Sequence, residues 1–350
     1  MDSRPRLGFL GVGWIGRHRL SSIIEHGNAE IVAIADPNPG NLDAAIGEAP
    51  SAMRCENLGQ LLERSLDGVV IATPSGLHAE HCVTALSRGV AVFCQKPLAR
   101  SAAEARRVVD AARAADRLIG LDLSYRHTRA VRELRKVVRS GELGRIFAID
   151  LVFHNAYGPD AAWFYDKVAS GGGCVIDLGV HLVDLALWLL DFPPVLAVDS
   201  QLFAKGEPLV EGSQVVEDYA SVQLQCGDGV VLRLTCSWRI SAGRDAVFQV
   251  ALYGSDGGAA MKNVGGSFYD FVAERYDGPT KQVLASPPDP WGGRAATGWV
   301  EQLARSRSFD PEARDFVEVA RVIDAIYAGA GGHAHYGELV TPASAREVCV

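Results

Sequence analysis

The sequence predicts an α/β protein in which an N-terminal domain with a parallel sheet precedes a C-terminal α+β domain with a large, mostly antiparallel open sheet. The chain has 350 residues, enough for two domains of about 150 residues each. Short apolar runs alternate with helix-like stretches up to about residue 120, which is typical of parallel strands joined by helices. Beyond Tyr125, strand-like runs follow one another with short turns, which indicates antiparallel pairing. We expect domains over residues 1–123 and 124–350, and the last residues could pack back onto the first domain.

The first domain contains five short apolar runs without alternation, as expected of strands that are buried on both faces of a sheet. These runs are Leu7–Leu10, Ile31–Ala35, Val69–Ala72, Val90–Cys94 and Leu118–Leu121. The helix-like stretches are Ile15–Ile24, His78–Arg88 and Ala102–Ala114. Ser101 and Glu104 have the spacing of a capping box, which predicts the start of the last helix.

The second domain begins with a helix that ends at Gly141 and continues mainly as strands. The expected helices are Ala130–Arg139, Val175–Leu190 and Pro311–Tyr327. The expected strands are Ile146–His154, Val195–Phe203, Tyr219–Gln225, Val230–Trp238, Val247–Tyr253 and Ser267–Glu274. Gly227-Asp228-Gly229 lies between two strands and predicts a hairpin, and the prolines and glycines of Ser286–Gly293 predict a loop.

Composition limits the partners and the compartment. The chain has 34 Lys and Arg against 42 Asp and Glu, a net charge of −8, so we expect neither nucleic acid nor an anionic membrane as partner. Its seven cysteines are odd in number and form no CxxC pair, which indicates a reducing compartment without a disulfide framework. The N-terminus lacks the apolar region of a secretory signal, and no apolar window reaches the roughly 18 residues of a spanning helix. We expect a soluble, cytoplasmic protein.

Three glycines after the first strand indicate a dinucleotide site. Gly11, Gly13 and Gly16 follow an apolar strand and begin a helix, which is the context in which G-x-G-x-x-G predicts dinucleotide binding. Gly11 would allow the tight turn, Gly13 the approach of a diphosphate, and Gly16 the close packing of helix on strand. Main-chain N–H groups at the helix start, around Trp14 and Ile15, would hold the diphosphate.

Asp36 follows the second strand, 20 residues after Gly16. A carboxylate at this place accepts hydrogen bonds from the adenosine ribose hydroxyls, and it would repel a 2′-phosphate. The alternative is a turn aspartate before Pro37. The spacing favours the ribose role, so we expect NAD as cofactor, and NADP is less favoured.

Two further motifs end strands at the edge where open α/β sheets bind ligands. Thr73-Pro74-Ser75 follows the third apolar run, and Gln95-Lys96-Pro97 follows the fourth. A lysine before a proline is often only a surface residue. At this edge, Lys96 could instead meet the substrate beside the nicotinamide.

The second domain offers a polar stripe on an otherwise apolar helix. Asp177, His181 and Asp184 have the i, i+4, i+7 spacing of one helix face, after the turn Gly171–Gly173. Buried polar groups need a partner or a function. The residues alone leave two interpretations open: a capping aspartate that satisfies a core histidine, or a catalytic pair.

Taken together, GVGWIG, ATPSGLH, QKPLA and GGGCVIDLGVHLVDLALWLL resemble the glucose–fructose oxidoreductase / inositol dehydrogenase / MocA (Gfo/Idh/MocA) family, in order and spacing from Leu7 to about Tyr336. The resemblance implies a Rossmann domain, an α/β domain with a large open sheet, and hydride transfer between NAD(P) and a sugar or cyclitol hydroxyl. Lys96 matches the lysine of the family's E-K-P motif, and Asp177 and His181 match its acid and histidine. It also implies cofactor contacts at Thr73, Pro74, Ser75, His78, Gln95 and Lys96.

The mechanism that follows places a substrate CH–OH between the nicotinamide and the pair Lys96 and His181. His181, oriented by Asp177, would take the hydroxyl proton, while Lys96 would hold the oxygen; the sequence does not decide which of the two is the base. By position we expect further substrate contacts at Tyr125, Arg126, His154 and Trp163, each of which could equally be structural. Trp238 and Trp291 are other aromatic candidates for stacking on a sugar ring.

One departure from the family pattern concerns the residue before Lys96, which is Gln95 where the family has glutamate. It removes a charge and leaves an NAD-binding but non-catalytic sugar sensor of the same fold as the alternative to an enzyme. A zinc site on His333, His335 and the Asp177 face is a weaker option, because no other ligand spacing supports it, and we expect no metal. We also expect a homodimer or homotetramer that packs through the second sheet.

Overall fold

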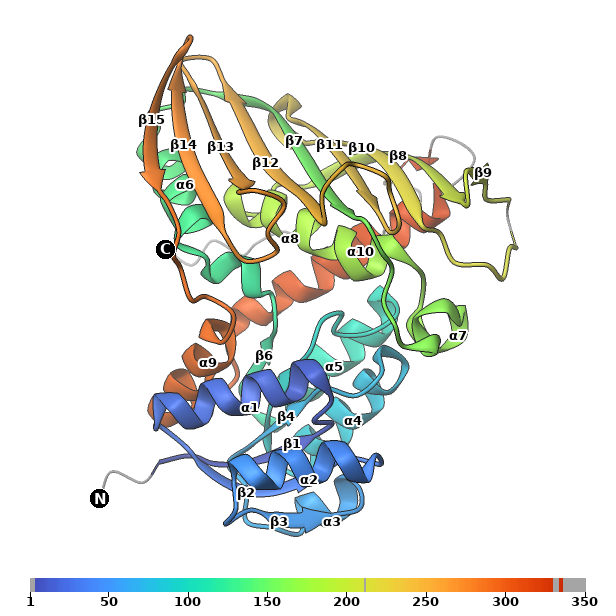
Figure 1. Ribbon diagram of the computed structural model, residues 1–350, viewed down its shortest axis with the longest axis vertical. Helices are drawn as coiled ribbons and strands as arrows, with labels where there is room; N and C mark the ends of the chain where they lie inside the picture. The colour runs from blue at the N-terminus through green and yellow to red at the C-terminus, as the bar shows by residue number, and fades with distance from the viewer. Residues whose placement is uncertain (1–3, 211, 330–333, 336–350) are drawn as a thin grey trace.

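The computed structural model describes residues 4–210, 212–329 and 334–335 and contains two sheets, one in each half of the chain (Figure 1). The six-stranded sheet lies at one end of the molecule and the ten-stranded sheet at the other, with helices between them. This is the α/β architecture that the sequence predicts.

The first sheet is parallel throughout, in the order β3-β2-β1-β4-β5-β6. Its strands are β1 (Arg6–Leu10), β2 (Glu30–Ala35), β3 (Met53–Cys55), β4 (Gly68–Ile71), β5 (Ala91–Cys94) and β6 (Ile119–Leu121). Its helices are α1 (Trp14–His26), α2 (Pro39–Glu48), α3 (Leu58–Leu62), α4 (Ser75–Ser87) and α5 (Ala102–Ala115). The five apolar runs are all strands of this sheet. The edge strand β3 was not predicted, because it is three residues long and largely exposed, without an apolar run.

The strand order places the candidate residues at one edge. β1 pairs with β2 on one side and with β4 on the other, so the order reverses there, and a crevice forms at the carboxyl ends of the strands. Gly11, Asp36 and Thr73 follow β1, β2 and β4, and Gln95 follows β5. The motifs separated in sequence therefore lie along one side of the first sheet.

The second sheet has the order β15-β14-β13-β12-β7-β11-β10-β8-β16, with β9 paired to β8. Its strands are β7 (Ile146–Asn155), β8 (Val195–Ala204), β9 (Glu207–Pro208), β10 (Tyr219–Cys226), β11 (Val231–Ser237), β12 (Ala246–Gly254), β13 (Gly258–Asn263), β14 (Phe271–Asp277), β15 (Thr280–Ala285) and β16 (Ala334–His335). Only β7 and β11 pair in parallel among these strands. The hairpin at Gly227–Gly229 is confirmed, since it joins the antiparallel strands β10 and β11.

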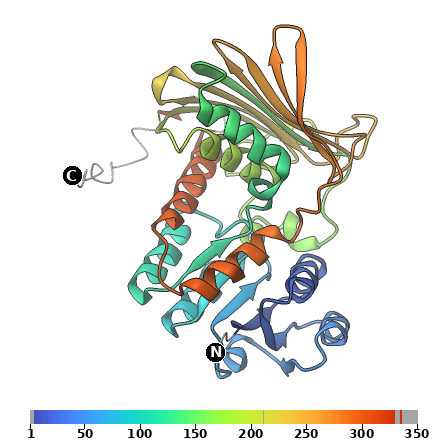
Figure 2. The ribbon, with the colours of Figure 1, turned by 90° about the vertical axis from the view of Figure 1, so that its left-hand side faces the viewer.

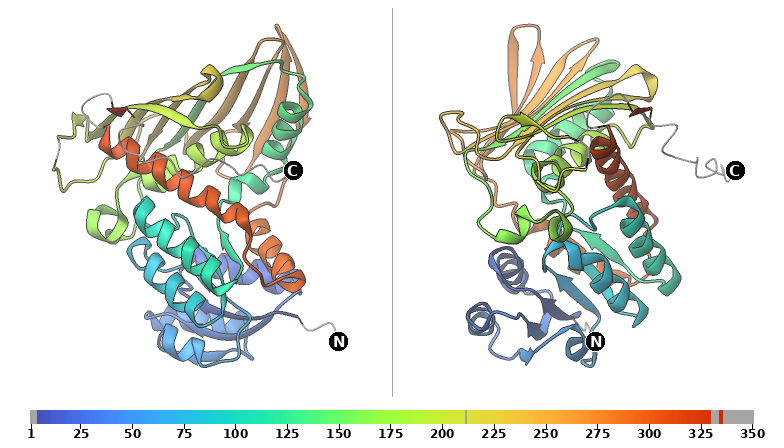
Figure 3. Two further views of the ribbon diagram at one scale, coloured as in Figure 1. Left: turned by 180° about the vertical axis from the view of Figure 1, so that it is seen from behind. Right: turned by 90° about the vertical axis from the view of Figure 1, so that its right-hand side faces the viewer.

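Helices cover one face of the second sheet and leave the other turned outward (Figures 2 and 3). The covering helices are α6 (Arg129–Ser140), α8 (Val180–Leu189) and α10 (Arg314–Ala328). The strands alternate accordingly: in β10, Ala220, Val222 and Leu224 are buried, whereas Gln223 and Gln225 are exposed. Because α8 and α10 lie between the sheet and the first domain, their polar residues can reach the cleft.

The helix expected over Val175–Leu190 is not one α-helix. Its first turn, Val175–Gly179, is π-helical, and α8 starts at Val180. A π turn interrupts the regular 3.6-residue repeat and often occurs at functional sites. Asp177 and Asp184 consequently pair with different cations, Lys96 and Arg126, rather than forming one stripe with His181.

Helix α9 (Arg294–Arg305) was not predicted and packs on the first domain, although it follows the second sheet in the chain (Figure 1). Trp299 of this helix is buried, with its ring centroid 5.6 Å from that of Phe93 on β5. Helix α10 then runs beside α5. These two helices hold the two sheets together.

The apolar segment Lys167–Leu189 includes α7 (Lys167–Ser170) and α8 and is long and apolar enough to cross a membrane. However, 89% of its most apolar window is buried inside the protein, so core packing explains its hydrophobicity. The six cysteines in the described part of the chain are free thiols, and Cys349 and His333 lie outside the described residues.

Candidate active site

The three glycines between β1 and α1 form a cradle that fits a diphosphate. Gly11 has a φ of +86°, and a Cβ there would lie 2.5 Å from the carbonyl oxygen of Ala72. A Cβ on Gly16 would lie 2.2 Å from the Gly11 oxygen, so this glycine serves the packing of α1 on β1. A Cβ on Gly13, by contrast, would meet only Asn41, at 3.9 Å. The space beside Gly13, where α1 starts at Trp14 without a side-chain cap, is therefore left for a ligand.

Asp36 lies next to this cradle and is held by main-chain groups. Its Oδ2 accepts a hydrogen bond from Val12 N at 2.7 Å, and its Oδ1 accepts one from Asn38 N at 2.8 Å. Asn41 Nδ2 also donates to Oδ1, at 3.4 Å. The carboxylate is partly exposed, and Oδ2, with one hydrogen bond, can accept another. The arrangement fits the ribose role proposed from the sequence.

His78 has a different environment from the one expected of a cofactor contact. Its ring is buried, and both nitrogens face carbonyl oxygens at 2.7 Å, Nδ1 that of Pro97 and Nε2 that of Thr73. Burial lowers the pKa of His78, against the effect of these two carbonyls. Its side chain thus joins the loops after β4 and β5 through Thr73 and Pro97.

Lys96 and Asp177 form an ion pair across the two halves of the protein. Lys96 follows β5, and its Nζ donates to Asp177 Oδ1 at 2.6 Å and to the Asp177 main-chain oxygen at 2.8 Å. The second carboxylate oxygen accepts from Trp238 Nε1 at 3.0 Å. The side chains of Lys96 and Asp177 are 21% and 14% exposed, so the pair is shielded but reachable from solvent.

His181 lies in the first turn of α8 and is buried without a partner for Nδ1. Burial, and then the charges of Lys96 and Arg19, hold the pKa of His181 well below its usual value. The imidazole is consequently neutral at pH 7 and can accept a proton. We expected Asp177 to orient it, but both Asp177 oxygens have other partners.

Aromatic side chains enclose His181. The ring of Tyr125 packs edge-on against it at 4.8 Å between centroids and stacks on Phe248 at 4.8 Å. Trp291 lies 5.0 Å from Tyr125, and its Nε1 donates to Tyr269 O. Tyr125 therefore borders His181, and both Tyr125 and Trp291 belong to the buried core of the second domain.

Three other predicted substrate residues lie apart from this cluster. Arg126 is paired with Asp184, whose side chain is 2% exposed. His154 projects from the outward face of the second sheet, where Nδ1 contacts Ser237 Oγ at 2.8 Å and the ring stacks on Tyr219. Trp163 stacks on Phe164 at 3.8 Å between ring centroids, in a loop before α7. Each of the three residues therefore has a structural partner.

Glu217 is a buried acid that the sequence did not single out. Its Oε1 accepts from Gly173 N and Val175 N, both at 2.9 Å, and from Tyr327 Oη at 2.8 Å. Burial raises the pKa of Glu217, against these hydrogen bonds. The carboxyl group orders the turn that leads into Asp177. Arg19 and Asp122 are likewise polar neighbours of the site that only the tertiary contacts identify, whereas Trp238, an aromatic candidate from the sequence, binds Asp177 through its indole N–H.

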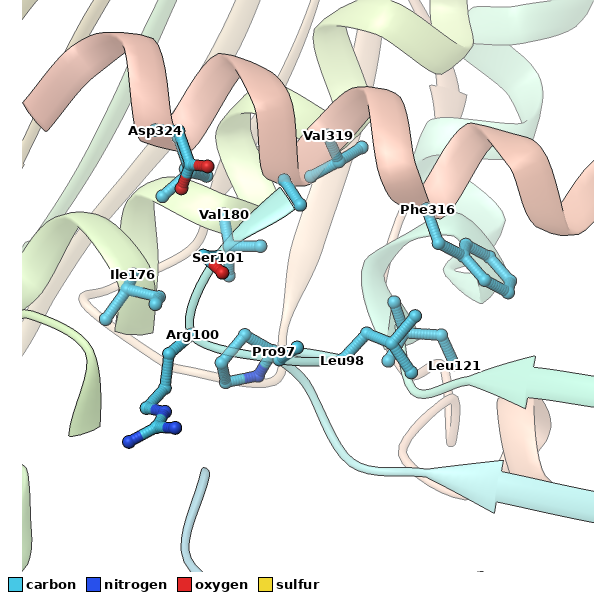
Figure 4. A pocket seen from close by; sticks show the side chains of 13 residues that line it. Pro97, Leu98, Arg100, Ser101, Leu121, Ile176, Val180, Phe316, Val319 and Asp324 are labelled. Carbon is cyan, nitrogen blue, oxygen red and sulfur yellow. The ribbon is translucent and has the colours of Figure 1, made fainter. Parts of the chain in front are cut away.

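A small cavity of about 20 Å³, room for roughly one water molecule, lies behind the Lys96 loop (Figure 4). Pro97 and Leu98 line it from the first domain, and Ile176 and Val180 line it from the π turn and α8. At its rim, Asp324 of α10 accepts a hydrogen bond from Ala102 N at the start of α5, at 2.9 Å. The Lys96 loop, the π turn and α8 thus pack tightly together on this side.

The polar side chains of the site are arranged as an ion pair and an imidazole rather than as a set of metal ligands. Asp177 is bound to Lys96 and Asp184 to Arg126, so the polar face proposed as a zinc site is divided between two cations. Over the described residues, no group of three His, Cys, Asp or Glu side chains could hold a metal ion.

Comparison with known proteins agrees with this geometry. Residues 6–123 match the family described as "Oxidoreductase family, NAD-binding Rossmann fold", and residues 131–260 match the "GFO/IDH/MocA C-terminal domain". D-glucoside 3-dehydrogenase of Escherichia coli is 27% identical over 75% of this chain and 78% of its own. Inositol 2-dehydrogenase of Rhizobium meliloti is 25% identical over 74% of this chain and 76% of its own.

Solved structures share the whole fold. Levoglucosan dehydrogenase in complex with NADH superposes with a TM-score of 0.81 at 20% identity, over 95% of this chain and 99% of that one. Aldose–aldose oxidoreductase from Caulobacter crescentus, complexed with glycerol, gives 0.82 at 20% identity over the same shares. With its cradle, its ion pair and both matching domains, the chain belongs to the Gfo/Idh/MocA family of NAD-binding oxidoreductases.

Proposed function

We propose that this protein oxidises a secondary hydroxyl of a sugar, sugar derivative or cyclitol with NAD⁺, or reduces the corresponding ketone with NADH. The observation that carries this proposal is the Lys96–Asp177 ion pair, which brings a charged donor from the first domain beside the neutral His181 of the second. A donor next to a neutral base is what removal of a hydroxyl proton requires.

Each residue has a separate task in the proposed reaction. Lys96 donates a hydrogen bond to the substrate oxygen and stabilises its developing negative charge. Asp177 holds the Lys96 ammonium, and Trp238 fixes Asp177. His181 takes the hydroxyl proton. The alcohol carbon gives up a hydride and its oxygen a proton, so the products are the ketone, NADH and one proton.

Gly11, Gly13, Gly16 and Asp36 would hold the dinucleotide that accepts the hydride. Their geometry, described above, leaves room at Gly13 and an acceptor at Asp36. The substrate class rests on the relatives, whose names include dehydrogenases of glucosides and inositol. Tyr125, which borders His181, offers an aromatic ring to a sugar.

The experiment that tests the proposal is an NAD⁺-reduction screen over inositols, pentoses, hexoses, glycosides and sugar acids, with reverse assays on ketones. On the best substrate, Lys96→Met should lower kcat by about two to four orders of magnitude. NADH binding should change several-fold at most. His181→Asn should lower kcat and remove one limb of the pH–rate profile, because one titrating group is lost.

Asp177→Asn should reduce kcat less, since Asp177 acts through Lys96. Near-wild-type turnover by Lys96→Met would contradict the mechanism. Tight NADH binding without turnover on any compound would instead favour a sugar-sensing protein of the same fold.

We also propose a division into domains at residues 123 and 124, with α9 contributed by the second domain to the core of the first. The packing of Trp299 on Phe93 supports this exchange. We further propose a cytoplasmic homo-oligomer that assembles through the outward face of the second sheet. The free thiols and the apolar side chains on that face support this proposal.

A further inference from the structure

A buried ion pair joins the dinucleotide helix α1 to Asp122, which follows β6 and lies against Gln95, the residue before Lys96. Arg19 of α1 donates from Nε to Asp122 Oδ2 at 2.6 Å, and the two side chains are 5% and 0% exposed. Ser124 Oγ donates to Asp122 Oδ1 at 2.7 Å. Burial acts to raise the pKa of Asp122, but Arg19, with hydrogen bonds from Ser124 and Gln95, outweighs it and holds the pKa below its usual value. Asp122 is therefore ionised and fully compensated by one cation.

Asp122 also determines how the Gln95 amide is oriented. Gln95 is buried, and its Nε2 donates to Asp122 Oδ2. An ionised carboxylate only accepts hydrogen bonds, so it must face the NH₂ group of the amide. In the part of the chain that the structure describes, no group donates to Gln95 Oε1, and this oxygen is not among the fully buried polar atoms. The carbonyl end of the amide is thus available to a ligand.

The topology places this amide where the nicotinamide half of the dinucleotide is expected. Asp36 follows β2, so the adenosine half lies on that side of the switch point between β1 and β4. The other half then extends over the ends of β4 and β5, towards Lys96. Gln95 follows β5 and precedes Lys96.

We propose that Arg19, Asp122 and Gln95 form an electrically neutral floor to the nicotinamide site, with Asp122 as the positioning residue that turns the Gln95 carbonyl towards the ring. The consequence concerns the two redox forms of the cofactor. The nicotinamide ring is positively charged in NAD⁺ and uncharged in NADH, so a neutral floor does not favour NAD⁺. A glutamate at position 95 would add a negative charge, and it would have to share Arg19 with Asp122. The inference rests on the proposed function only for the place of the nicotinamide beside Lys96.

The test measures the ratio of the dissociation constants of NADH and NAD⁺ without substrate, by NADH fluorescence and by competition with NAD⁺. Gln95→Glu, at pH 8.5, should raise Kd(NADH)/Kd(NAD⁺) on the order of tenfold, for a unit charge within about 10 Å at an effective dielectric constant of about 20. Asp122→Asn should lower the ratio by a similar factor, because Arg19 is then unpaired. Gln282→Glu adds the same charge to the exposed strand β15, and should leave the ratio unchanged.

Asp122→Asn leaves a buried cation without its partner and can prevent folding. The swap Gln95→Glu with Asp122→Asn keeps one carboxylate for Arg19 and should fold, with a ratio within about twofold of wild type. A ratio within twofold of wild type for Gln95→Glu, in a protein with an unchanged thermal unfolding transition, would overturn the proposal. If Gln95→Glu does not fold, a ratio in the swap more than about fivefold from wild type would also overturn it. Because the dissociation constants are measured without turnover, failure of this inference can be distinguished from failure of the proposed function in the substrate screen.

Discussion

Lys96 and Arg126 are both basic residues for which we expected a contact with substrate, and the structure pairs each with a different aspartate. Lys96 meets Asp177 where both side chains are still partly exposed, so its ammonium remains accessible to a ligand. Arg126 meets the buried Asp184 and lies over the rings of Trp188 and Phe192. The two pairs differ mainly in the exposure of the aspartate, which is 14% for Asp177 and 2% for Asp184, and this difference supports the role proposed for Lys96.

The role of Asp36 can be tested by changing the cofactor preference. Asp36→Ser with Pro37→Arg removes a ribose acceptor and a repulsive charge and adds a cation for a 2′-phosphate. The ratio of kcat/KM for NADP⁺ over NAD⁺ should rise at least about tenfold, equivalent to roughly 1.4 kcal/mol. Asp43→Ser, at an exposed acid paired with Arg54 on the same side of the domain, should not change it. Wild-type protein that already prefers NADP⁺ would show that Asp36 has another role.

Asp315 on α10 offers a test of stability against pH. Burial, and then the charges of Glu312, Asp184 and Glu318, raise the pKa of Asp315 to about 6, although Arg126 acts in the opposite direction. Because the folded pKa exceeds the unfolded value, the ionised group destabilises the protein at pH above about 6, and the penalty disappears as the pH falls towards 4. Asp315→Asn should therefore raise the free energy of unfolding by about 1 kcal/mol at pH 7.5, after allowance for partial exposure.

The gain from Asp315→Asn should shrink towards zero at pH 4.5 in urea or thermal unfolding. Asp277→Asn, at the exposed end of β14, serves as the control and should show little dependence on pH. An equal gain at both pH values would mean that charge is not the cause.

The turn Gly171–Gly173 and the π turn after it form one structural unit that presents Asp177 to Lys96. Glu217, in the loop before β10, ties the turn by its side chain, while its main-chain oxygen accepts from Cys174 N at 3.0 Å. Three glycines are needed here because neighbouring segments of the same chain come too close to leave room for a Cβ atom. The loop before β10 therefore determines the position of Asp177, the partner of Lys96.

Gly173→Ala should disrupt this unit. An added Cβ would lie 1.9 Å from the Glu217 main-chain oxygen, so either the turn or the loop before β10 must move. We expect a loss of about 1–3 kcal/mol in stability, the usual cost of overpacking, and a fall in kcat larger than the change in NADH affinity. Gly298→Ala in α9 is the matched control: nothing lies within 4 Å of the added atom, and it should stabilise the helix by up to about 1 kcal/mol. Equal kcat in the two variants would show that the turn does not contribute to the reaction.

Across the whole molecule, a layer of helices lies between the two sheets, and the residues of the candidate site come from both sides of this layer (Figure 3). The first sheet supplies the cradle, Asp36 and Lys96, and the helical layer of the second supplies Asp177 and His181. The outward face of the second sheet lies on the side away from these residues. It carries small and apolar side chains such as Val152 and Val247 between polar ones.

That face leads to a prediction about assembly. Wild-type protein should sediment as a dimer or tetramer at micromolar concentration, because the outward apolar side chains would be covered by a second copy. Val152→Lys, in the middle of β7, should shift the protein towards monomer, because an uncompensated charge would be buried in the interface. Val264→Lys, in an exposed loop after β13, should not. A monomeric wild type would refute the assembly through this sheet.

The elements that the sequence predicts correctly are those with a strong local signal. The five buried strands, the capped helix α5 and the glycine hairpin each depend on a periodicity or turn residue within a few positions. The short or polar strands β3, β13 and β15, and the helix α9, lack such a signal, because packing against distant segments stabilises them. The dinucleotide motif and the family motifs are also local, so the residues alone indicate the cofactor site and the family.

The partners of the polar side chains could not be predicted in this way. Spacing alone suggested that Asp177 orients His181. In the structure, because of the π turn and the position of Lys96, Asp177 forms an ion pair with the lysine instead. Likewise, nothing near Gln95 in the sequence indicates that Asp122 and Arg19 lie against it. An ion pair or hydrogen bond depends on where two backbones meet to within a few tenths of an ångström. Sequence patterns report which residues are buried and in which element, and only the packing of those elements determines which charges meet.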